Sequence, residues 1–149
     1  MSLIVFIVIA FIPAVAGAFF TPGDWYDQLD KPSWNPPSWL FGPVWTVLYA
    51  LIGISAWLIW RRYGDAAIRW GLVIWAIQLA LNAIWTPVFF GLKRPDLAVP
   101  IILTLVIAII ANIVAFWVLD VTAACLLLPY LAWVSFASAL NIAVWRLNA

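Results

Sequence analysis

The chain has 149 residues, of which 68% are hydrophobic and only 9% are charged. A soluble domain of this length would carry about 25% charged residues, so this chain has too few polar groups to cover itself in water and its solvent must be lipid. The net charge of +1 argues against a nucleic-acid partner, because there is no basic surface to neutralise phosphates.

Five long stretches contain no Asp, Glu, Lys or Arg: residues 1–23, 32–60, 70–92, 97–119 and 121–145. Each can hold a spanning helix, which needs about 20 mainly apolar residues, whereas barrel strands run about ten residues and alternate in polarity. The sequence therefore predicts an all-α membrane protein, a five-transmembrane-helix bundle with a long structured first loop, formed as one domain by residues 1–149. The expected spans are 2–20, 42–61, 67–91, 97–119 and 122–146.

The first of these spans has a second interpretation. The letters AVAGA at 14–18 resemble a signal-peptidase site after an apolar run. Against cleavage, no Lys or Arg precedes the run, and the run is long for a signal peptide. We therefore expect a retained helix, with Pro13 as a point of kinking.

The first loop, residues 21–41, is rich in rings and prolines, and its segment 31–39 reads KPSWNPPSW. Proline fixes its own φ angle and restricts the residue before it. The loop is therefore expected to be stiff and to act as a lid over the helix ends. An interfacial belt of aromatic residues explains Trp39 but not the density of rings in the whole loop.

The later connections are short, which forces neighbouring helices to lie antiparallel. Asp120 precedes the fifth span and is expected to cap its N-terminus. Pro87 and Pro129 lie within the third and fifth spans and predict kinks there. The cationic residues are divided too evenly between the two sides for the positive-inside rule to give the orientation.

Neutral polar residues within the spans carry the functional signal. Gln78 and Asn82 share one face of the third helix with Trp75, Trp85 and Phe89 at spacings of three and four residues. An unpaired amide in hydrocarbon costs several kcal/mol, so these side chains should face the bundle interior. They predict either hydrogen bonds between helices or a cavity with aromatic walls and a few polar groups.

Two further stripes point the same way. Tyr130, Trp133, Ala137 and Asn141 recur at helical spacing on the fifth span, and Trp45 precedes Tyr49 by four residues on the second. The sequence has no His and no Glu. It therefore offers no zinc site, no usual axial ligand for haem and no acid–base pair in the membrane, so no metal or cofactor is predicted.

Four stretches carry a resemblance to a known family: WYDQLDKPSWNPP at 25–37, the tryptophan at 45, NAIWTPVFFGLKRPDLA at 82–98 and LLPYLAWVSFASALN at 127–141. The chain resembles the TspO/MBR family of bacterial tryptophan-rich sensory proteins and translocator proteins. The resemblance implies a five-helix bundle, often a homodimer, with one pocket at the end of the first loop. The ligands of that family include porphyrins, sterols and isoquinoline carboxamides.

Carried over by position, the resemblance implies a pocket with contributions from the loop and three spans. Its residues would be Trp25, Tyr26, Trp34, Trp45, Tyr49, Asn82, Trp85, Trp133 and Ala137. The stripes described above select Trp45, Asn82, Trp85 and Trp133 independently.

These observations leave three hypotheses. The first is a receptor or carrier in a bacterial membrane that binds porphyrins and similar flat ligands, with sterols as a further class. The second is an enzyme that degrades porphyrin in light through Trp45 and Trp133, a chemistry that needs oxidisable rings more than acids and bases. The third is a regulatory membrane partner without its own ligand, in which the polar stripes pack together and leave no cavity.

Overall fold

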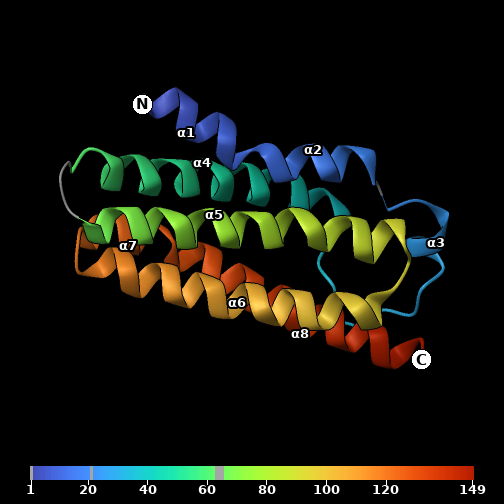
Figure 1. Cartoon of the computed structure of the whole chain (residues 1–149). Coiled ribbons are helices and arrows are strands. Elements are labelled where there is room, and N and C mark those ends of the chain that lie inside the picture. Colours follow the sequence, from blue (N-terminus) through green and yellow to red (C-terminus); the bar gives the residue numbers. More distant parts are fainter. Residues whose placement is uncertain (1, 21, 63–65) are drawn as a thin grey trace.

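The computed structural model describes residues 2–20, 22–62 and 66–149, and within these ranges every regular element is helical. The long helices lie side by side and alternate in direction (Figure 1). Four of them are long and apolar enough to cross a membrane, and the first apolar helix, Leu3–Phe19, is shorter. The expected five-helix membrane bundle is confirmed.

The first span is a bent pair of helices, α1 (Leu3–Ala10) and α2 (Ile12–Phe19). The break falls at Phe11, because Pro13 in the first turn of α2 has no N–H to continue the ladder from α1. The bend directs α1 onto α4 and α2 onto α5. The kink predicted at Pro13 therefore has a structural purpose, since it lets one span contact two neighbours.

The first loop carries a short helix, α3 (Asp24–Asp27), and a 3-10 turn, η1 (Ser38–Leu40), which leads directly into α4 (Phe41–Trp60). After the connection at 61–65 comes α5 (Ala66–Thr86), which ends in a π-helical turn, η2 (Pro87–Gly91). Pro87 opens this turn, because a proline removes one helical hydrogen bond and the backbone re-pairs at wider spacing. The third span thus changes its winding at the proline where a kink was predicted.

The last two spans are α6 (Pro95–Trp117) and the pair α7 (Val121–Leu126) and α8 (Leu128–Leu147). The fifth span is interrupted at Leu127, two residues before Pro129, because the proline takes a place in the first turn of α8. The Asp120 side chain accepts a hydrogen bond of 3.2 Å from the Ala123 backbone N–H, which confirms the predicted cap. Asp120 also pairs with Arg62 at 3.1 Å and so ties α7 to the end of α4.

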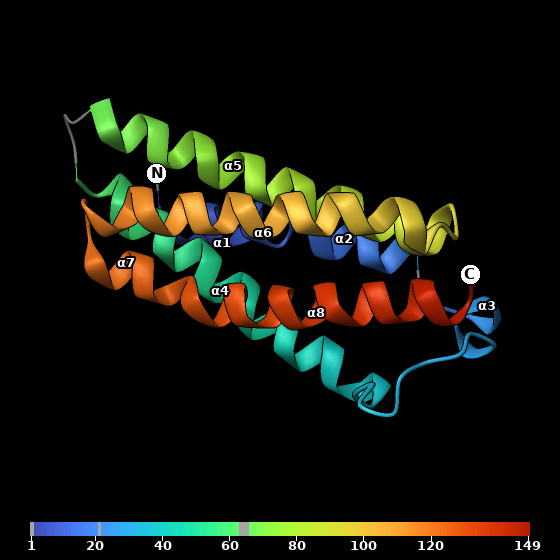
Figure 2. The same ribbon diagram turned by 90° about the horizontal axis from the view of Figure 1, so that it is seen from below.

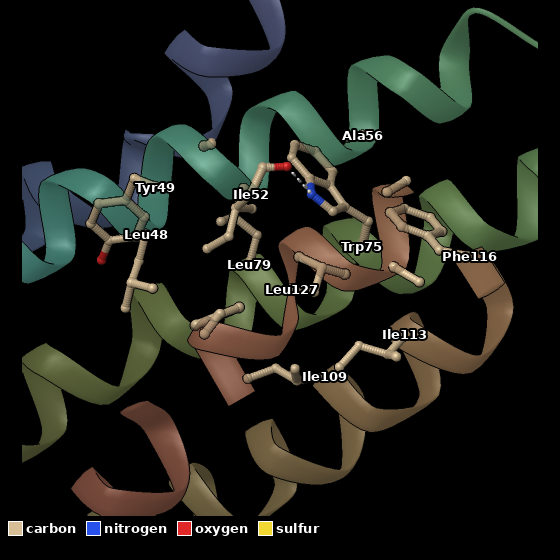
Figure 3. Packing of buried hydrophobic residues seen from close by; sticks show 14 of the residues in the cluster. Leu48, Tyr49, Ile52, Ala56, Trp75, Leu79, Ile109, Ile113, Phe116 and Leu127 are labelled. Atoms are coloured by element: carbon tan, nitrogen blue, oxygen red, sulfur yellow. Dashed lines mark hydrogen bonds between the residues drawn. The ribbon is translucent and has the colours of Figure 1, made fainter. Parts of the chain in front are cut away.

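The end of the bundle that holds α1 and α7 is closely packed. Figure 3 shows Trp75 between α4 and α5, where its indole N–H donates to the Ile52 carbonyl at 3.1 Å. A Cβ on Gly53 would lie 2.8 Å from the Cα of Ile7, so α1 and α4 touch backbone to backbone. Small residues at helix contacts permit the close approach by which helices associate in lipid.

Candidate ligand cavity beneath the first loop

A cavity of about 540 Å³ lies at the other end of the bundle. Its walls come from α2, the first loop, α4, the end of α5 with η2, α6 and α8. In Figure 2 the start of α4 diverges from α5 and α6 toward this end. The described lining residues are Phe11, Pro13, Ala14, Gly17, Phe20, Pro22, Tyr26, Ser38, Phe41, Gly42, Trp45, Thr46, Tyr49, Asn82, Trp85, Thr86, Phe89, Phe90, Ile102, Leu105, Trp133, Val134, Ala137, Leu140, Asn141 and Val144.

Two glycines lie in the cavity wall. A Cβ built on Gly17 of α2 or on Gly42 of α4 would meet nothing within 4 Å, in contrast to Gly53 at the packed end. Both positions therefore have room for a side chain that glycine leaves unfilled.

A chain of polar side chains runs from the cavity wall into the bundle. The Tyr49 hydroxyl donates to Asn82 Oδ1 at 3.2 Å, and Asn82 Nδ2 donates to the Tyr130 hydroxyl at 2.8 Å. The Tyr130 hydroxyl in turn donates to Gln78 Oε1 at 2.8 Å. Each group fixes the next, so Asn82 is held in one orientation at the cavity wall. Its second Nδ2 hydrogen and second Oδ1 lone pair are not used by these bonds.

A second polar contact orients Trp85. Its indole N–H donates to Asn141 Oδ1 at 2.9 Å, and Asn141 Nδ2 donates to the Pro95 carbonyl at 3.0 Å. The Trp85 ring stacks on Phe89 at 5.0 Å between centroids. The indole N–H of Trp85 is thus hydrogen-bonded within the protein, and an aromatic face of the ring remains beside the cavity.

The opposite wall is also aromatic. The Trp45 ring stacks on Tyr49 with centroids 5.3 Å apart and planes 29° from parallel. Trp133 of α8 meets Phe41 edge to face at 5.7 Å. No charged side chain is among the described residues that line the cavity, so the site favours an apolar, flat molecule with few polar atoms.

The first loop closes one side of the cavity through Tyr26. Its ring contacts Phe90 at 5.5 Å, and Lys31 Nζ lies 4.5 Å from the ring centroid on one face. Burial raises the pKa of the Tyr26 hydroxyl above its usual value, so it stays a neutral group at physiological pH.

Of the residues predicted for the site, the structure brings together Tyr26, Trp45, Tyr49, Asn82, Trp85, Trp133 and Ala137 around the cavity. Trp25 and Trp34 are not among its lining residues. Trp25 packs behind the wall against Phe89 at 5.9 Å. Trp34 contacts Phe136 at 5.6 Å and borders a separate outer groove with Ile142 and Arg146.

The stripe of polar and aromatic residues on the third span, α5 with η2, lines the cavity only in part. Asn82, Trp85 and Phe89 line the cavity, whereas Gln78 and Trp75 lie deeper in the packed half. The sequence reasoning also missed the wall from the first span, which includes Phe11 and Gly17. That span is apolar on all sides, so no periodic pattern could mark the face that meets the cavity.

Together, the apolar spans, the bundle and the ring-lined cavity define a multi-pass α-helical integral membrane protein with an internal cavity at one end. A model of the TspO/MBR family matches residues 3–146, and the chain belongs to that family.

Curated relatives cover most of the chain and most of their own length. The protein CrtK of Rhodobacter capsulatus is 44% identical over 89% of this chain and 83% of its own. A tryptophan-rich sensory protein of Cereibacter sphaeroides is 42% identical over 91% and 84%. The human translocator protein is 42% identical over 89% and 81%. The family match over residues 3–146 includes the first loop and extends into all five spans.

Proposed function

We propose that the protein is a membrane receptor or carrier for porphyrins and similar flat hydrophobic molecules, with sterols as a second ligand class. The observation that carries this proposal is the uncharged cavity of about 540 Å³ walled by Trp45, Trp85 and Trp133. Its volume lies within the range of about 300–1,000 Å³ typical of small-molecule sites. The amide of Asn82 supplies one fixed polar group, and the rings supply faces on which a flat ligand can stack.

A titration of tryptophan fluorescence with protoporphyrin tests the proposal. We expect Trp133→Ala and Trp45→Ala each to raise the dissociation constant at least tenfold, because each removes a wall of the cavity. Trp70→Ala is the matched control, since Trp70 is 69% exposed and is not among the lining residues. The midpoint of the titration is the quantity to compare, because the amplitude changes whenever a tryptophan is lost. Equal midpoints in all four proteins would remove the assigned site.

A second candidate function is light-dependent degradation of a bound porphyrin. It is favoured by the position of Trp45 and Trp133, two oxidisable indoles, in the cavity wall. Illumination of the complex followed by absorbance separates the two functions. Bleaching with a defined product that is lost in Trp45→Phe and Trp133→Phe supports the enzyme, whereas an unchanged spectrum supports the receptor.

The third hypothesis, a regulatory partner without a ligand, expects a filled interior, and the cavity weighs against it.

We also infer that the protein forms a homodimer in a bacterial membrane. Cross-linking in native membrane vesicles, followed by mass determination, checks the dimer, and a purely monomeric product would exclude it.

A further inference from the structure

The first loop is joined to the end of α8 by one side chain, that of Asn148. Asn148 Oδ1 accepts a hydrogen bond from the Asp30 backbone N–H at 2.9 Å. Asn148 Nδ2 donates to the Asp30 carbonyl at 2.9 Å and to the Val144 carbonyl at 2.8 Å. The amide therefore pairs with both backbone groups of Asp30 while it is itself fixed to the last turn of α8. Figures 1 and 2 agree that α3 and the C-terminal end lie at the same end of the bundle.

Among the described residues, these are the hydrogen bonds that connect loop residues 22–40 to the helical bundle. The other contacts of the loop with the bundle are between rings, such as Tyr26 with Phe90 and Trp34 with Phe136. Ring contacts can slide, whereas a two-point amide pairing fixes position along the chain. Both Asp30 and Asn148 are exposed, so water can replace these hydrogen bonds and the pairing can open.

The chain has a glycine that can act as a hinge before this pairing and a stiff, proline-rich segment after it. Gly23 has φ +72°, a conformation that glycine adopts without strain, and a Cβ there would meet nothing within 4 Å. Between Gly23 and Asp30 lies α3, which carries Tyr26 into the cavity wall. Beyond Asp30 the prolines at 32, 36 and 37 stiffen the chain. With Asp30 released, the segment that carries Tyr26 would be held to the bundle by ring contacts, such as Tyr26 with Phe90 and Trp25 with Phe89, and no longer by hydrogen bonds.

We propose that Asn148 is the latch of the lid: its pairing with Asp30 holds the loop closed, and its opening sets the rate at which the cavity exchanges its occupant. This inference rests on the proposed function for the identity of that occupant. Because Asn148 is not among the cavity-lining residues, it acts on access and not on contacts with the ligand. The pairing is the same in the free and the bound protein and closed most of the time in both, so weakening it multiplies the association and dissociation rates by the same factor, and the effects on the dissociation constant cancel.

The test compares Asn148→Ala with Asp30→Ala in lipid nanodiscs. Asp30→Ala is the matched control, because the latch uses only the backbone of residue 30 and should survive loss of the carboxylate. Amide exchange of residue 30 is measured in the ligand-free protein, and association and dissociation of protoporphyrin are measured by stopped flow, with excess lipid vesicles as acceptor. For Asn148→Ala we expect all three rates to rise by the same factor, roughly tenfold, as two ordinary hydrogen bonds predict. Asp30→Ala should match the unaltered protein in both protoporphyrin rates and in the protection of the residue 30 amide relative to its intrinsic exchange rate.

Three results would overturn the latch. Unchanged amide exchange at residue 30 in Asn148→Ala would show that the pairing does not hold the loop. Faster exchange with unchanged protoporphyrin rates would show that the pairing does not control access, and a changed dissociation constant with one altered rate would indicate a binding role. If the unaltered protein does not bind protoporphyrin, the proposed function fails by itself. The ligand-free exchange rate then decides only whether the pairing holds the loop: an unchanged rate overturns the latch, and a tenfold rise supports the closing of the loop but not the control of access.

Discussion

The two halves of the bundle are built from the same residue types but differ in how the helices meet. Around α1 and α7, Gly53 lets two backbones touch and Trp75 fills the space between α4 and α5. Beneath the loop, Gly17 and Gly42 face open space, and the tryptophans stand around a cavity. A glycine or a tryptophan therefore does not by itself determine whether a position is closely packed or lines a cavity. The distance between the neighbouring helix backbones at that position decides between the two.

The largest expected difference between the halves is in the cost of losing a tryptophan. Trp75→Ala should lower the free energy of unfolding by about 3–5 kcal/mol, as large core truncations do, because Trp75 is 4% exposed and hydrogen-bonded. Trp45→Ala should cost roughly 2 kcal/mol or less, since Trp45 is less buried and removing it enlarges an existing cavity. Reversible unfolding in mixed micelles measures both. Equal losses would mean that the two halves are equally packed.

A methyl group on a glycine gives the next contrast. Gly53→Ala should destabilise the protein by about 1–3 kcal/mol, because overpacking is costly and the new Cβ would meet the Ile7 backbone. Gly17→Ala should be neutral or stabilising by up to about 1 kcal/mol, since alanine is the better helix former. The unfolding midpoints in the same micelles give the comparison. Equal shifts would contradict the close approach of α1 and α4.

A larger side chain at Gly17 should reduce ligand binding, because Gly17 lines the cavity. Gly17→Leu is expected to raise the dissociation constant for protoporphyrin at least tenfold, or about 1.4 kcal/mol, because the side chain enters the empty space. The unfolding free energy should be unchanged or higher by up to about 1 kcal/mol, since leucine is nearly as good a helix former as alanine. Loss of binding together with loss of stability would indicate a distorted helix instead.

The smallest effects are expected at the polar contact of the packed end. Asp120→Ala removes both the helix cap and the pair with Arg62, and should cost about 1 kcal/mol. Arg62→Gln leaves the cap and should cost about 0.5 kcal/mol or less, as exposed ion pairs do, because the Arg62 side chain is 57% exposed. Thermal unfolding at low and high salt separates the two, since only the ion pair is screened. A loss in Arg62→Gln of more than half the loss in Asp120→Ala would show that the pair outweighs the cap.

Much of this architecture could be predicted because lipid leaves few choices. Uncharged stretches had to be helices, and the amides of Asn82 and Asn141 had to face inward. The sequence could not reveal that Trp75 and Trp85, ten residues apart on one face, belong to different halves. That division depends on where α4 diverges from its neighbours, a tertiary property without a periodic signal. The contribution of Gly17 was hidden for the same reason, since an empty space leaves no mark on a uniformly apolar helix.

The bend at Phe11 gives the first span two separate tasks, which are joined through a single register. Its first half is seated on Gly53, and its second half presents Gly17 to the cavity. Removal of one residue between Phe11 and Gly17 would rotate the later positions by about 100° and leave the seat on α4 untouched. The lipid-facing residues of the first span can therefore vary freely in type. The number of residues between its contact with Gly53 and Gly17 is constrained, because both ends of that interval have fixed neighbours.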